Sequence, residues 1–137
     1  MVADITVHMR GAVSLEQYLL DNDFEVNTIT DSVFSATRDG ELPIYINHLD
    51  NNLFFEVDLC SLKDIGSEDL YKALLDANTE ILPVSAGIDN TNPEDPRLVL
   101  VESREADNLD VNELLSVFSA MELATDKMET ILSAYVK

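Results

Sequence analysis

Apolar and polar residues alternate with a period of two from Phe24 to Cys60, a pattern typical of half-buried strands. Asp39-Gly40 is a strong hairpin signal because glycine adopts a positive φ without steric strain, and residues 50–52 predict a second turn. The segment therefore predicts an antiparallel meander of three strands, over residues 24–38 with a break at 30–32, over 42–47 and over 53–60.

Three other segments have a helical period and begin at a capping residue, which is Ser14, Ser67 and Asp110 in turn. Residues 84–88 and 98–104 favour two short strands on either side of a polar loop. The resulting order, α-β-β-β-α-β-β-α, predicts an α+β fold with an antiparallel sheet of about five strands. No linker or repeat interrupts residues 1–137, so we expect a single domain.

The third helix carries an apolar stripe with spacings of three and four residues. Such a stripe either packs on the core of its own domain or is shared with a partner, and methionines often line adaptable binding surfaces. The candidate partner or dimer surface consists of Phe118, Met121, Met128, Leu132 and Tyr135.

Charge excludes several classes of partner. The 137 residues include 27 acids and 8 bases, for a formal charge of −19, which repels nucleic acids and anionic lipids. A salt-adapted, acidic proteome would explain part of this charge without any function. The acidic N-terminus has no signal-peptide pattern, and apolar runs are far shorter than the roughly 20 residues that span a bilayer. We therefore expect a cytoplasmic protein that does not insert into membranes.

Motifs for catalysis are absent from the sequence, which contains no G-x-S-x-G, G-x-G-x-x-G or P-loop pattern. Its single cysteine, Cys60, follows acidic and apolar residues that raise the pKa of a thiol, so a structural role is expected. The histidines, His8 and His48, are not in a metal-ligand pattern, and the loop over 89–95 fails the spacing of an EF-hand. We predict no enzyme and no cofactor. An alternative is a metal- or small-ligand-dependent enzyme or sensor that uses this acidic loop together with His48.

The assembled order of elements resembles the type III secretion chaperone-like fold, which is also that of YbjN-type proteins. More narrowly, two parts of the chain are similar to the YjfI-type family of small bacterial cytoplasmic proteins. The first consists of residues 41–46, 53–55 and 58–60, and the second of residues 74–78 and 82–86. The resemblance implies a dimeric cytoplasmic protein, often encoded beside membrane-stress proteins of the phage-shock type, and supplies no catalytic residues.

The preferred hypothesis is thus a non-enzymatic, chaperone- or adaptor-like module that binds an unidentified protein partner and forms a homodimer. An acidic rim would speed the capture of a basic partner, and salt would weaken that effect. A third hypothesis is that the acidic surface mimics nucleic acid, so that this protein occupies the nucleic-acid site of a DNA-binding protein.

Overall fold

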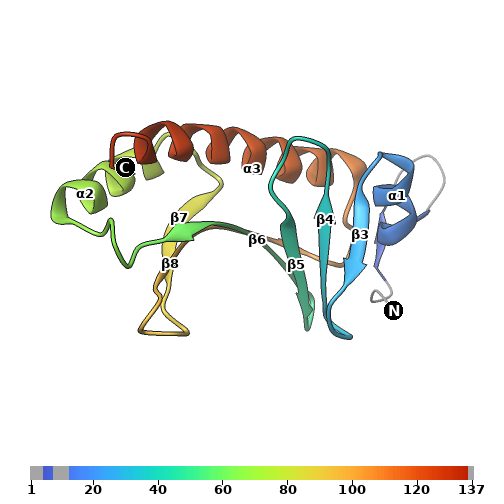
Figure 1. Ribbon diagram of the computed structural model, residues 1–137. Helices are drawn as coiled ribbons and strands as arrows, with labels where there is room; N and C mark the ends of the chain where they lie inside the picture. Colours follow the sequence, from blue (N-terminus) through green and yellow to red (C-terminus); the bar gives the residue numbers. More distant parts are fainter. Residues whose placement is uncertain (1–4, 8–12, 136–137) are drawn as a thin grey trace. The chain divides into compact units, whose positions relative to one another are not determined.

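The computed structural model describes residues 5–7 and 13–135, and this part of the chain folds into helices and strands in mixed order (Figure 1). The helices are α1 (Leu15–Asp21), α2 (Glu68–Asn78) and α3 (Val111–Leu132). The strands are β1 (Thr6–Val7), β2 (Val13–Ser14), β3 (Glu25–Thr28), β4 (Val33–Thr37), β5 (Ile44–Leu49), β6 (Asn52–Ser61), β7 (Ser85–Asp89) and β8 (Arg97–Glu105). The predicted α+β class is confirmed.

Six strands form one sheet in the order β3-β4-β5-β6-β8-β7, and β1 pairs with β2 in a small separate sheet. From β3 to β6 each strand pairs antiparallel with the next, so the predicted meander is confirmed. β7 pairs antiparallel with β8 and ends the sheet. The short β1–β2 pair was not predicted, and the candidate ligand His8 lies outside the described residues.

The sheet has six strands instead of about five because the break at residues 30–32 is a hairpin turn. Thr30 Oγ1 accepts hydrogen bonds from the N–H groups of Ser32 (3.2 Å) and Val33 (3.1 Å). The Ile29 N–H donates to the Val33 carbonyl at 2.9 Å. A side-chain oxygen that accepts from the following backbone reverses the chain. The predicted first strand is therefore two antiparallel strands, β3 and β4.

The three predicted helix caps are confirmed. A side-chain oxygen of Ser14, Ser67 and Asp110 accepts a hydrogen bond from the N–H three residues further on, at 3.1, 3.1 and 2.7 Å. Each bond satisfies an N–H that has no partner within its helix. The Gln17 side chain donates instead to Asp21, at 2.7 Å, and so does not return a hydrogen bond to the α1 cap.

The chain divides into two compact units. Unit 1 consists of Met1–Glu56 and Glu102–Phe118, and unit 2 of Val57–Val101 and Ser119–Lys137. Each of the three boundaries falls inside a continuous element, namely β6, β8 and α3. The single domain over residues 1–137 stays a prediction.

Aromatic rings hold the first turns of α3 in unit 1. The Phe118 ring lies 4.9 Å from that of Phe24 and 6.1 Å from that of Phe55, the latter in an edge-on geometry at 90°. The Arg38 guanidinium covers the Phe24 ring at 4.5 Å. Offset and edge-on pairs add to the stabilisation that comes from burying the rings themselves.

In unit 2, α2 lies beside the C-terminal half of α3 (Figure 1). The buried face of α2 consists of Leu70, Leu74 and Ala77. Lys127 of α3 forms an ion pair with Glu80, just beyond α2, at 3.1 Å. Among the described residues, no helix is both long and apolar enough to cross a bilayer.

Candidate protein-binding surfaces

The predicted partner surface on α3 lies mostly in the core of this chain. Phe118, Met121, Met128 and Leu132 are buried, with at most 6% of each residue exposed, and Tyr135 is half-buried. A partner could contact the four buried side chains only if α3 left the core. A stripe of this width faces the core of its own domain in most globular proteins. That these residues bind a partner stays a prediction, and the folded chain offers other apolar surfaces.

An apolar groove lies between α2 and β7 in unit 2. It has a volume of about 260 Å³, and its walls are almost entirely apolar. Leu75 is 67% exposed and Ile88 52% exposed, so both side chains are accessible at this groove. The lining residues are Tyr71, Leu74, Leu75, Asn78, Ala86, Gly87, Ile88 and Leu98.

A second apolar surface lies on the outer face of the meander in unit 1. Tyr45 of β5 and Phe54 of β6 are 37% and 43% exposed. The register pairs Tyr45 with Glu56 and Asn47 with Phe54, so the two aromatic residues are diagonal neighbours on one face. Side chains at that spacing are within reach of one another. We call this pair of rings, with Glu56 beside them, the aromatic face.

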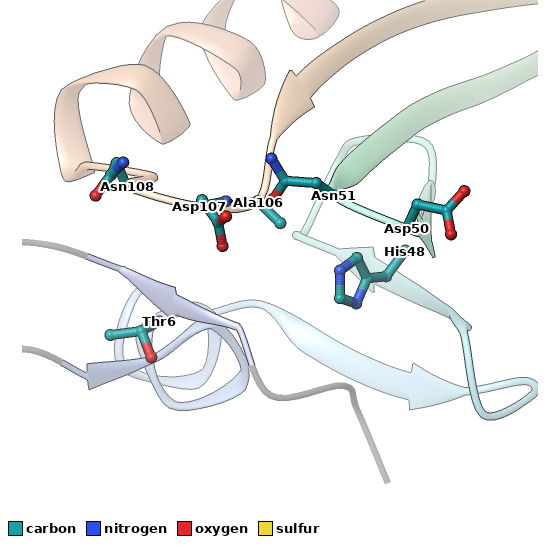
Figure 2. Close-up of a pocket in the computed structure, with 7 residues that line it drawn as sticks. All are labelled: Thr6, His48, Asp50, Asn51, Ala106, Asp107 and Asn108. Carbon is teal, nitrogen blue, oxygen red and sulfur yellow. Dashed lines mark hydrogen bonds between the residues drawn. The ribbon is translucent and has the colours of Figure 1, made fainter.

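His48 lines an open hollow in unit 1 that also includes Asp50 and Asp107. Figure 2 shows the seven lining side chains spread around this space, without convergence on one point. Two hydrogen bonds from the backbone N–H groups of Ala106 and Asp107 to Asn51, at 2.8 and 3.0 Å, hold the two loops together. No residue of the 89–95 loop lines this hollow.

The acidic loop uses its side chains to hold its own shape. Asp89 Oδ1 accepts hydrogen bonds from the Thr91 N–H (3.0 Å) and hydroxyl (2.6 Å), and these bonds lower the pKa of Asp89. Asn92 Oδ1 accepts from the Glu94 N–H at 3.1 Å. These contacts are the turn chemistry expected of such a sequence.

Asp95 at the end of the loop is held by two partners. It accepts a hydrogen bond from the Ser61 hydroxyl and lies 3.5 Å from Nη1 of Arg97. The Ser61 bond is the larger cause of the lowered pKa of Asp95, and the charge of Arg97 also lowers it. Arg97 in turn binds Asp58 at 3.0 Å. Over residues 5–7 and 13–135, no three histidine, cysteine or acidic side chains lie close enough to hold a metal ion, so no metal site supports the alternative function.

Cys60 is half-buried, and burial is the main cause that raises the pKa of its thiol. The nearby charge of Arg97 opposes this effect without overcoming it. A raised pKa keeps the sulfur protonated and weakly nucleophilic. These surroundings support the structural role predicted for Cys60.

Glu102 is a buried acid that the sequence analysis missed. Its side chain is 2% exposed, and Oε1 lies 2.6 Å from Nη2 of Arg104. Within the described part of the chain, neither carboxylate oxygen accepts a well-aligned hydrogen bond. Burial raises the pKa of Glu102, and Arg104 only partly opposes it. The signal was present in the sequence, because Glu102 continues the inward-facing alternation of Leu98 and Leu100.

A family model, CesT_Tir_1, matches residues 9–137, and the chain belongs to this family of type III secretion chaperones. None of the curated proteins matches the chain. The family confirms the chaperone-like fold predicted from the order of elements.

Two solved structures have the same fold at low sequence identity. One chain of the heterodimeric ExoU-SpcU complex, from the type III secretion system of Pseudomonas aeruginosa, is 16% identical with a TM-score of 0.68. That match covers 85% of this chain and 96% of the other. YbjN from E. coli is 17% identical with a TM-score of 0.58, over 85% of this chain and 89% of its own. The narrower YjfI-type resemblance stays a prediction.

Proposed function

We propose that this protein is a non-enzymatic, chaperone- or adaptor-like module that binds a segment of another protein. The family match over residues 9–137 carries this proposal. The neighbouring complex of ExoU with SpcU supports it, because that structure is a heterodimer within a secretion system. The exposed apolar surfaces supply the physical means, since burying apolar area drives most protein association.

The aromatic face is the proposed contact for this partner. Tyr45 and Phe54 supply apolar area, and the formal charge of −19 on the chain favours a partner segment that carries lysine or arginine. Aromatic residues are enriched at the centres of protein interfaces, and complementary charge around them speeds association. Because salt screens exposed charges, capture should be faster at low ionic strength.

A pull-down from native lysate at low and high salt tests this function, with Phe54→Ser compared against Leu123→Ser. Leu123 is a 70% exposed apolar residue on α3, so its variant controls for a general loss of apolar surface. We expect a stoichiometric protein that is lost with Phe54→Ser and retained with Leu123→Ser. Recovery of no such protein at either salt concentration, or equal recovery by both variants, would contradict the proposal.

The proposed molecule is a homodimer in which the groove between α2 and β7 meets a second copy. Leu75 and Ile88 would lose most of their exposed surface in such a contact. Two copies of charge −19 repel each other, so higher salt should tighten the dimer. Light scattering should give a dimer mass that falls to the monomer with Leu75→Glu and is unchanged with Leu123→Glu. A monomeric wild-type protein at tens of micromolar would refute the homodimer.

The proposed setting is the cytoplasm, with a partner linked to membrane-stress proteins of the phage-shock type. This part of the proposal rests on the YjfI-type resemblance alone. Mass spectrometry of the protein captured by the wild type and lost with Phe54→Ser identifies the partner. If the captured protein were instead a basic transcription or repair protein, the result would favour mimicry of nucleic acid.

A further inference from the structure

β7 is an edge strand, because it is last in the order of the sheet and pairs only with β8. An edge strand normally presents a row of free N–H and C=O groups, to which a strand from another chain can pair. In this protein the row is occupied by a side chain from the end of α2.

Asn78 binds both backbone groups of Ala86. The Ala86 N–H donates to Asn78 Oδ1 at 2.7 Å, and Asn78 Nδ2 donates to the Ala86 carbonyl at 3.3 Å. A side-chain amide carries the same donor and acceptor as a peptide group. Asn78 therefore takes the place that a residue of a neighbouring strand would have.

The rest of the edge follows from the alternation of an antiparallel strand. Since both groups of Ala86 bond to Asn78, they point away from β8, and those of Ile88 point to the same side. The N–H of Val84, two residues before Ala86, donates to the Ile81 carbonyl at 3.0 Å. Ile88 is thus the position of β7 at which this edge is not covered by Asn78 or by the turn before the strand.

We propose that Asn78 closes the edge of β7 to strand addition by a second copy of this chain. With Ala86 occupied, an incoming strand can bond only at Ile88, and a single residue pair is too small a contact to hold two chains. The geometry of the open edge would otherwise suit a symmetric pairing. If Gly87 lay on a two-fold axis, Ala86 of each copy would pair with Ile88 of the other. Each of these two residue pairs would form two main-chain hydrogen bonds, four in all.

Closing the edge selects the kind of contact that this part of unit 2 can make. Asn78 prevents a second strand from pairing with β7. The side chains of Tyr71, Leu75 and Ile88 remain accessible in the groove between α2 and β7. The role of Asn78 does not depend on the proposed homodimer, because it concerns main-chain pairing and not the apolar contact.

The test is the mass of Asn78→Ala by light scattering over a concentration series at high salt, where charge repulsion is screened. We expect the mass to rise with concentration to twice that of the wild type. In the Leu75→Glu background, which already lacks the groove contact to which Ile88 contributes, Asn78→Ala/Ile88→Lys should return to the mass of Leu75→Glu alone, because a lysine on an edge strand opposes pairing. The series is repeated with Leu75→Glu added, which removes the groove contact and so separates this test from that of the homodimer.

Asn22→Ala is the matched control, since Asn22 also lies at the end of a helix but donates to its own helix, at the Tyr18 carbonyl, at 2.8 Å. An unchanged mass for folded Asn78→Ala, a rise that Ile88→Lys does not reverse, or an equal rise with Asn22→Ala would each overturn the proposal. If Asn78→Ala does not fold, hydrogen exchange of the wild type decides. Ala86 should be protected and Ile88 should exchange faster, and fast exchange at Ala86 would reject the closed edge.

Discussion

A single buried carboxylate, Glu102, combines high burial with one ion pair. Burial disfavours the charged form more than Arg104 favours it, so the pKa of Glu102 in the folded state lies above its usual value. An acid with a raised pKa stabilises the fold fully only below its unfolded pKa, and that contribution is lost as pH rises through the folded pKa. At neutral pH the buried Glu102 carboxyl therefore weakens the fold.

Glu102→Gln should raise the melting temperature at neutral pH, and the difference from the wild type should vanish as the pH falls toward 4, where carboxyl groups protonate. The amide resembles the protonated acid in shape, so packing is kept. Thermal melts of Glu102→Gln across pH check this, with the exposed neighbour Glu105→Gln as control. A less stable Glu102→Gln at neutral pH would mean that the pair with Arg104 outweighs the cost of burial.

Asp95 shows the opposite shift at the surface. Its pKa is lowered chiefly by the Ser61 hydroxyl and to a smaller extent by Arg97. The contribution of such an acid to stability is present above its unfolded pKa and is lost as pH falls through the folded pKa. We expect Ser61→Ala to raise the pKa of Asp95 more than Arg97→Ala does, as measured by NMR titration of the side-chain carboxyl. A larger effect of Arg97→Ala would show that charge, and not the hydroxyl, controls this loop.

Among the elements, α3 best separates core from surface. Met121 is fully buried, whereas Leu123, two residues later, is 70% exposed. Met121→Ala should lower the free energy of unfolding by about 2–5 kcal/mol, because it leaves a cavity, and Leu123→Ala should change it by only about 0.5 kcal/mol. Urea denaturation measures both. Similar losses for the two variants would mean that the exposed face of α3 is covered in solution.

The elements themselves were largely predictable because their signals are local. A capping residue such as Ser67 acts within one turn of helix, and alternation within β6 sets which side chains are buried. The turn at Thr30 was predicted only as a break because residues 30–32 include turn-forming side chains but no glycine, which would indicate a tight hairpin. The bonds from Asn78 to Ala86 join different elements, and no period in the sequence indicates them.

The binding surfaces were harder to predict than the fold. An apolar stripe shows that a helix face avoids water, but it does not say whether the cover is the chain itself or a partner. Phe118 and Met121 are covered by this chain. The groove beside Leu75 depends on how α2 packs against β7, which is a tertiary property.

At the scale of the whole molecule, three continuous elements pass through the boundaries between the units. Unfolding one unit would therefore disrupt β6, β8 and α3, each of which continues into the other unit. We expect the two units to unfold in one cooperative transition. Tyrosine fluorescence can follow each unit alone, since Tyr18 and Tyr45 belong to unit 1 and Tyr71 and Tyr135 to unit 2. A double variant that replaces both tyrosines of one unit by phenylalanine reports only on the other unit. The two such double variants should melt at the same midpoint. Two separate midpoints would indicate two domains.

The same connectivity affects how the protein is made. Phe24 and Phe55 are synthesised before Phe118, the ring of α3 that packs on both of them. At a synthesis rate of about 5–20 residues per second, several seconds pass before that residue is added. The newly made meander remains without this ring during that time, so unit 1 cannot finish folding until the first turns of α3 have been made.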